Sequence, residues 1–295
     1  MRGLVRWMLV ILGVGGLLAV TGAAATPPLQ PLPPFKEYTN PKDGSVMVLV
    51  PAGAFTMGSS QAEVDAVYDS VTSHFKGERM DKELYNREVP AHTVQLAAYS
   101  IGKYAVTNAQ YRRFVSATGY KTAGVSPTLT PGQWESYATQ WGETAPVVEV
   151  SWDDATAYCR WAGVRLPTEA EWEKAARGTD GRRYPWGNDW DPSRCHSQLA
   201  KISDRAAPVG SYPSGASPYG CLDMEGNVYQ WTDSWYQAYP GSTGHSGAFG
   251  EKYRVLRGCS WDYDFTSVYR AALRSYYQPG EHYFGVLGFR VARTP

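Results

Sequence analysis

Apolar and small residues alternate along two stretches of the chain, and this pattern predicts β-strands. The first stretch, residues 46–58, is interrupted at Pro51-Ala52-Gly53, so it predicts two strands joined as a pair by a tight turn. The second stretch, from Thr93 to Ile101, predicts a further strand.

Four helices are expected, and three of them begin at a capping box, in which Ser or Thr is followed three residues later by Glu or Gln. The capping boxes are Ser60/Glu63, Thr107/Gln110 and Thr168/Glu171. The fourth helix begins at Trp152 and carries two acids in its first turn, where they complement the helix dipole. Gly119 and Gly178 end two of these helices. The expected helices span residues 61–75, 108–117, 152–161 and 169–177.

The remaining sequence shows little periodicity. Residues 120–147 contain three prolines and are expected to be irregular, and after Gly178 short strands alternate with turns. The 11 Trp and 21 Tyr residues, alongside 30 Gly and 20 Pro, indicate loop-rich structure held by large aromatic side chains. Without an internal repeat, this pattern predicts one α+β domain of low regular secondary structure at residues 46–293.

The N-terminus is typical of an export signal. A positively charged start precedes an apolar run at residues 7–20, and three alanines at residues 23–25 form a cleavage site. The apolar run is shorter than the ~20 residues of a membrane span, although an uncleaved anchor stays an alternative. We therefore expect a signal peptide at residues 1–25, a Pro-rich linker at residues 26–45, and a periplasmic or secreted protein.

Charge argues against one class of partner. The full chain is formally neutral, and loss of Arg2 and Arg6 with the signal leaves about −2. Proteins that bind nucleic acid usually present a basic face, so no nucleic-acid partner is expected. We expect a small-molecule or peptide substrate, and a protein that is not integral to the membrane after signal cleavage.

An exported chain with an even number of cysteines can form disulfides. The four are Cys159, Cys195, Cys221 and Cys259, and their spacings match no metal-binding pattern. Four cysteines allow three pairings, so the sequence leaves open one or two bridges of undetermined connectivity, or buried thiols.

Nine motifs occur in order along the chain: VPAGAFTMGS at 50–59, EVPAHTV at 88–94, YAVTNAQYRRF at 104–114, PVVEVSWDDATAYCRWAG at 146–163, RLPTEAEWEKAARG at 165–178, YPWGN at 184–188, GNVYQWTDSW at 226–235, RVLRGCSW at 254–261 and LGFRVAR at 287–293. Together they resemble the formylglycine-generating enzyme (sulfatase-modifying factor) family. The resemblance implies a single domain related to the C-type lectin fold, often calcium-bound. Its members include copper-dependent sulfatase activators, iron-dependent sulfoxide synthases, a periplasmic branch that matures the siderophore pyoverdine, and relatives that only bind.

Compared with the family, this chain lacks the metal-binding residues of two kinds of member. Copper members carry two cysteines after the glycine turn, because Cu(I) prefers sulfur ligands. Residues 258–268 contain only Cys259, which replaces a glycine, so the catalytic cysteine pair is missing and copper is not expected. The His-x3-His-x-Glu spacing of the iron enzymes is also absent from the sequence. The redox cofactor, if there is one, is unknown.

A structural calcium ion is implied by the turn at GNVYQW. The family's ligands map to Asp223, Gly226, Val228 and Gln230. Calcium prefers oxygen ligands at close spacing. Gln230 stands in place of the usual glutamate, and the alternative is a turn held by hydrogen bonds alone.

The family's substrate groove maps to the C-terminal third of the chain. By this alignment the candidate catalytic residues are Ser260, Arg274 and Tyr229. Ser260 has no evident paired base, and Arg274 either clamps a carboxylate or forms a structural salt bridge. Aromatic candidates for substrate binding are Tyr263, Phe265, Tyr277 and Tyr283.

These observations favour an exported protein that oxidatively matures a secreted small molecule or peptide, such as a siderophore chromophore. If it is an enzyme, it is an oxidoreductase. The alternatives are a noncatalytic binding module of lectin-like fold and a divergent sulfatase activator that generates formylglycine. The sequence does not indicate the substrate or the oligomeric state.

Overall fold

The computed structural model describes residues 36–74, 81–122, 133–200, 204–282 and 285–294. The expected signal peptide at residues 1–25 lies outside the described residues, as does most of the expected linker. In the part of the chain that is described, no helix is both long and apolar enough to cross a membrane.

The four predicted helices are confirmed, each within a residue or two of its expected ends. They are α1 (Gln61–His74), α3 (Asn108–Thr118), α5 (Trp152–Ala162) and α6 (Glu169–Arg177). The three capping boxes form as expected, and Ser151 with Asp154 makes a further one at the start of α5. A short helix, α2 (Glu83–Asn86), lies between α1 and α3 in the sequence. Local side-chain chemistry therefore fixes where these helices begin.

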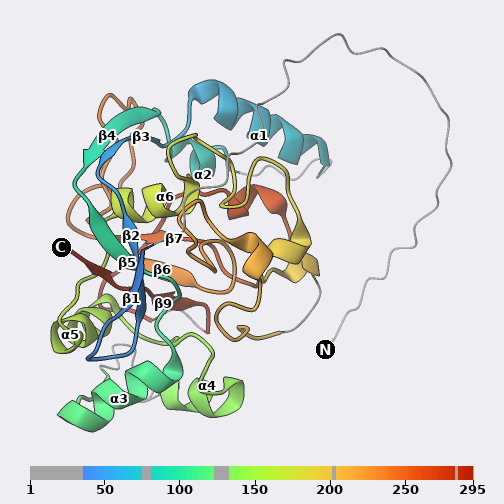
Figure 1. The fold of residues 1–295 in the computed structure, drawn as a ribbon. Coiled ribbons are helices and arrows are strands. Elements are labelled where there is room, and N and C mark those ends of the chain that lie inside the picture. Colours follow the sequence, from blue (N-terminus) through green and yellow to red (C-terminus); the bar gives the residue numbers. More distant parts are fainter. Residues whose placement is uncertain (1–35, 75–80, 123–132, 201–203, 283–284, 295) are drawn as a thin grey trace, which may run out of the picture. The chain divides into compact units, whose positions relative to one another are not determined.

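The expectation of an irregular segment at residues 120–147 is wrong in its second half. Residues Gln133–Trp141 form α4. Trp134 and Ala138, four residues apart, are both buried, and the ring of Trp134 packs edge-on against Tyr111 of α3 at 5.0 Å. Figure 1 shows α3 and α4 side by side. Tertiary burial of one helix face stabilises this short helix.

The strands form three sheets, and the pairing within residues 46–58 differs from expectation. One sheet has the order β1-β2-β5-β10, a second consists of β3 and β4, and the third has the order β8-β7-β6-β9. The strands are β1 (Glu37–Thr39), β2 (Val46–Val50), β3 (Gly53–Met57), β4 (His92–Leu96), β5 (Tyr99–Gly102), β6 (Tyr229–Trp235), β7 (Arg254–Arg257), β8 (Ser275–Tyr277), β9 (Leu287–Phe289) and β10 (Ala292–Arg293).

The prediction that β2 and β3 pair with one another is wrong, because they belong to different sheets. The buried ammonium group of Lys174 on α6 donates to the carbonyl oxygens of Pro51 and Gly53, at 2.8 and 2.9 Å. These bonds hold the corner between the strands against the helix. The stretch from Thr93 to Ile101 likewise forms two strands, β4 and β5, rather than one.

The packed chain begins before residue 46, inside the stretch that the sequence suggests as linker. Strand β1 pairs with β2. Asp43 is fully buried and accepts hydrogen bonds from Asn40 Nδ2 (2.7 Å), Ser45 Oγ (2.7 Å) and Tyr158 of α5 (2.8 Å). These contacts tie the N-terminal segment to α5.

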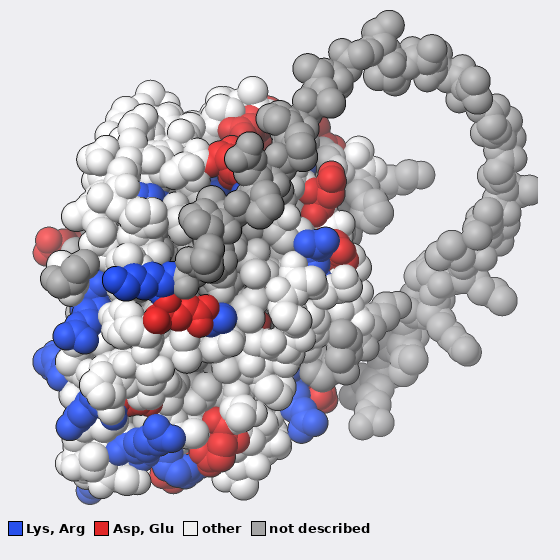
Figure 2. All heavy atoms as spheres, in the orientation of Figure 1, with Lys and Arg blue, Asp and Glu red and all other residues white. Residues whose placement is uncertain are grey.

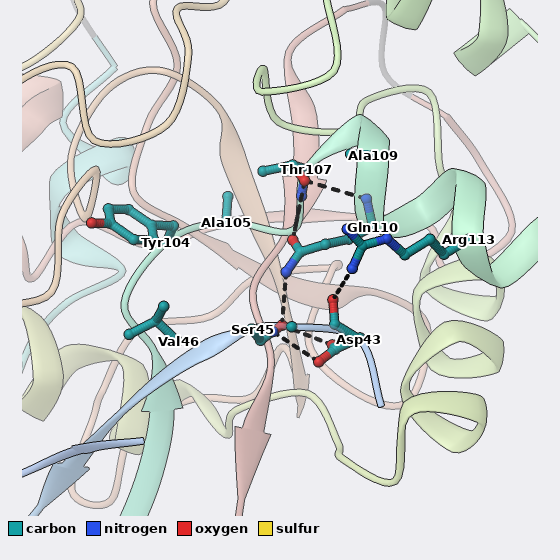
Figure 3. Close-up of a pocket in the computed structure, with 10 residues that line it drawn as sticks. Asp43, Ser45, Val46, Tyr104, Ala105, Thr107, Ala109, Gln110 and Arg113 are labelled. Carbon is teal, nitrogen blue, oxygen red and sulfur yellow. Dashed lines mark hydrogen bonds between the residues drawn. The ribbon is translucent and has the colours of Figure 1, made fainter. Parts of the chain in front are cut away.

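A small pocket of about 200 Å³ lies beside this N-terminal segment and is drawn in Figure 3. Its polar groups largely bond one another. Gln110 accepts from the backbone of Thr107 at 2.9 Å and donates to Ser45 at 3.2 Å. We assign no ligand to this pocket, because its polar side chains serve the fold.

Buried ion pairs join α6 to the third sheet. Glu169 and Glu173 of α6 both contact Arg257 of β7, at 2.9 and 2.6 Å. Glu88, which is fully buried, pairs with Arg270. On the molecular surface, by contrast, the face in Figure 2 shows Lys and Arg side chains lying among Asp and Glu side chains. The strongest electrostatic contacts are therefore inside the protein.

Candidate functional site

The site is built where the start of β6 meets the loop that follows β7. The backbone N–H of Gly226 donates to the carbonyl of Gly258 at 2.7 Å, and Trp261 N–H donates to Asn227 O at 3.1 Å. Between these bonds Cys259 has a φ of +52°, a left-handed conformation that is uncommon outside glycine. Paired turns of this kind fix the position of the side chains between them.

A thiol and two phenols come together at this position. The side chains of Cys259 and Tyr263 lie close enough to Tyr229 to contribute, besides burial, to raising the pKa of its phenol. Burial raises the pKa values of the Tyr229 phenol and the Cys259 thiol well above their ordinary range. Both groups are therefore neutral proton donors rather than anions near neutral pH.

A cavity of about 450 Å³ lies between α1 and the loop at residues 264–267, next to Tyr263 in the sequence. Its walls are Ser70, Val71 and Ser73 of α1, Leu199, and the loop Asp264, Phe265, Thr266 and Ser267. The Phe265 ring packs edge-on against Tyr263 at 5.6 Å, and Tyr263 packs against Tyr229 at 6.1 Å. Aromatic contacts thus run from Phe265, on the cavity wall, to Tyr229, and the cavity is large enough for a small molecule.

Three of the predicted site residues, Tyr229, Tyr263 and Phe265, are brought together here. Ser260 is adjacent, but its hydroxyl donates to Asp262 and its carbonyl accepts from Tyr269 at 2.9 Å. Tyr277 lies on β8 and is not among the described residues that line the cavity. Tyr283 lies outside the described residues.

Arg274 forms a structural salt bridge, one of the two roles that the sequence left open for it. It is 1% exposed and forms a bidentate pair with Glu169, at 2.6 and 3.0 Å. Its remaining donors reach the carbonyls of Arg87 and Gln237, each at 3.0 Å. Because these bonds engage the guanidinium, this geometry favours a role in packing over a role in substrate binding.

Sequence reasoning missed the contribution of α1 to the cavity and the carboxyl group of Glu225. Glu225 is 3% exposed, and within the described structure neither of its side-chain oxygens has a hydrogen-bond partner. Desolvation raises its pKa well above the usual range, and Arg257 and Arg270 only partly oppose this. The sequence signal was a second acid, two residues after Asp223 and directly before Gly226.

We expect Glu225→Gln to raise the melting temperature near neutral pH. An acid whose pKa is raised by folding costs stability once the unfolded chain ionises, so this cost grows as pH rises above ~4. The gain should shrink toward that pH, and the exposed Glu251→Gln should change little. Thermal unfolding of the three proteins across pH measures this, and a pH-independent difference would contradict it.

The four cysteines are buried thiols in this structure, one of the possibilities that the sequence left open. Burial raises the pKa of each thiol, which lowers its reactivity.

The predicted calcium ligands do not fit the ion as arranged. Gln230 Oε1 accepts from Trp172 Nε1 (2.8 Å) and from Arg290 Nε (2.5 Å), so both of its lone pairs are used. The carboxylate of Asp223 accepts from Gly210 N–H at 2.7 Å. Among the described residues, no group of three or more His, Cys, Asp or Glu side chains is arranged to hold a metal ion.

The fold and this site together define a domain of the formylglycine-generating-enzyme type. Residues 35–295 match the family model of the sulfatase-modifying factor enzyme 1-like domain. The chain belongs to this family, as its motifs indicate.

The proteins that this chain resembles have more than one activity. The chain is 35% identical to the formylglycine-generating enzyme of Streptomyces coelicolor, over 85% of this chain and 90% of that protein. It is 35% identical to the hercynine oxygenase of Mycolicibacterium smegmatis, over 72% of this chain, and spans about half (54%) of that longer protein. Among solved structures, PvdO from Pseudomonas aeruginosa matches with a TM-score of 0.66 and 26% identity, covering 90% of this chain and 100% of that one.

Proposed function

We propose that this protein oxidises a small aromatic molecule or peptide outside the cytoplasm, and that a siderophore precursor with a reduced chromophore is its substrate. The observation that carries the proposal is the 450 Å³ cavity with Phe265 in its wall, because the Phe265 ring contacts Tyr263, which in turn packs against Tyr229. An aromatic wall at Phe265 suits a planar substrate.

The family supports an oxidative reaction, and the sequence argues against the copper-dependent type of the sulfatase activators. The relatives include an oxygenase and formylglycine-generating enzymes. Residues 258–268 of this chain hold only Cys259, so a two-thiolate copper site of the sulfatase activators is not available there. The substrate class in this proposal comes from the resemblance to the siderophore-maturing branch, and the compartment comes from the export signal expected at residues 1–25.

The direct test incubates the purified mature protein with a reduced siderophore precursor and O₂. We expect the chromophore to lose two hydrogen atoms as O₂ is reduced to hydrogen peroxide, followed by absorbance and by mass. A Cys-x-Pro-x-Arg peptide serves as the competing substrate. An unchanged precursor, or conversion of the peptide instead, would contradict the proposal.

Blocking the cavity should strongly lower turnover without unfolding the protein. Ser70 is exposed on α1 and lines the cavity, whereas Ala66 is exposed one turn earlier and does not. We expect Ser70→Trp to lower kcat/KM about 100-fold, because displaced substrate loses its reactive geometry. Ala66→Trp, the matched control, should keep full activity. Equal activity of the two variants would place the reaction elsewhere.

A further inference from the structure

The turn at residues 223–230 is organised around a buried positive charge that belongs to the protein itself. Arg290, directly after β9, is fully buried. Its guanidinium donates to the carbonyl oxygens of Gly102 (2.8 Å), Leu222 (2.9 Å) and Asp223 (3.0 Å). Its Nε donates to the side-chain oxygen of Gln230 at 2.5 Å. Together with the carbonyl of Lys103, at 3.3 Å, five oxygens from three parts of the chain thus converge on one cation.

The amide of Gln230 completes this arrangement, and its orientation is unambiguous. The indole N–H of Trp172 and the guanidinium of Arg290 can only donate, so Oε1 must face both of them. The opposite end, Nε2, donates to the carbonyl of Asp223 at 2.9 Å. The amide therefore presents hydrogens, not a lone pair, to the oxygen of the turn.

Both side chains of the predicted ligand set are already engaged in hydrogen bonds at this turn. Calcium needs oxygen lone pairs from the side chain at position 230, and these are occupied by Trp172 and Arg290. The carboxylate of Asp223 accepts from the backbone N–H of Gly210 at 2.7 Å.

We propose that the Gln230 amide takes the place of the calcium-ligating carboxylate of related proteins, so that this chain holds the 223–230 turn by hydrogen bonds and needs no metal there. The replacement depends on Gln230 being an amide. A glutamate at this position would accept the bonds from Trp172 and Arg290 and still offer further lone pairs, but it could not donate to Asp223.

The test compares melting temperatures in millimolar calcium and in EDTA. We expect the wild-type value to be the same in both. Gln230→Glu should melt lower than wild type in EDTA, because two oxygens then face one another, and calcium should restore part of the loss. The control is Gln95→Glu, which makes the same charge change at an exposed position of β4 and should respond to neither reagent.

Terbium luminescence gives a second readout that does not depend on stability. Because Trp172 contacts Gln230, terbium bound at this turn would be excited through the indole. Wild type should give no sensitised emission, and Gln230→Glu should gain it. Calcium stabilisation of wild type that is lost in Gln230→Ala would overturn the proposal, as would a Gln230→Glu variant that is as stable as wild type in EDTA or that gains no ion response.

Discussion

Replacing Glu173 with alanine should lower the free energy of unfolding by about 3–5 kcal/mol, the cost of leaving a buried charge without its partner. Glu173 is fully buried and contacts Arg257 (2.6 Å), Arg177 (3.0 Å) and the backbone N–H of Gly58 (2.7 Å). Its removal leaves Arg177 without its carboxylate partner and leaves Arg257 paired with Glu169 alone. Denaturant unfolding of the purified mature protein measures the loss.

An exposed ion pair provides the comparison for Glu173. Glu143 pairs with Arg112 at 3.0 Å, with side chains that are 53% and 41% exposed. Glu143→Ala should cost no more than ~1 kcal/mol, because solvent screens such pairs. If the two substitutions cost the same, the buried network would not hold α6 to β7 as we describe.

The second large effect is expected for Gly226→Ala. Gly226 has a φ of +76°, and an added Cβ would lie 2.3 Å from the carbonyl oxygen of His196. Left-handed strain and a clash with rigid backbone together should cost roughly 3 kcal/mol or more. Because the turn at Gly226 positions Cys259 through its bond to Gly258, turnover should fall with stability.

The Gly163→Ala variant separates the cost of left-handed backbone strain from the cost of the Cβ clash. Gly163 ends α5 with a φ of +70°, but an added Cβ there meets nothing within 4 Å. This variant should lose only the conformational cost, about 1 kcal/mol. Thermal and denaturant unfolding of both variants would show the difference, and a Gly163→Ala loss as large as that of Gly226→Ala would contradict the role of the clash.

The sequence determined the features that depend on neighbouring residues. The starts of α1, α3 and α6 followed from capping side chains, the start of α5 from the acids in its first turn, and the ends of α3 and α6 from glycines, all signals that span only a few residues. The ordered motifs indicated the family. Alignment with the family's substrate groove pointed to Tyr229, Tyr263 and Phe265 as site residues. Each of these signals is carried by residues close together in the chain or by their fixed order.

Only the tertiary structure decided the features that depend on distant partners. Strands β2 and β3 separate because Lys174, more than a hundred residues away, holds the corner between them. The sequence left two roles open for Arg274, and its hydrogen bond to Glu169 favours the structural one. The same holds for the 223–230 turn, where Arg290 and Trp172 fix an amide that the sequence had suggested as a calcium ligand. A side chain's chemistry is written in the sequence, but the partner that uses up its hydrogen bonds is chosen by packing.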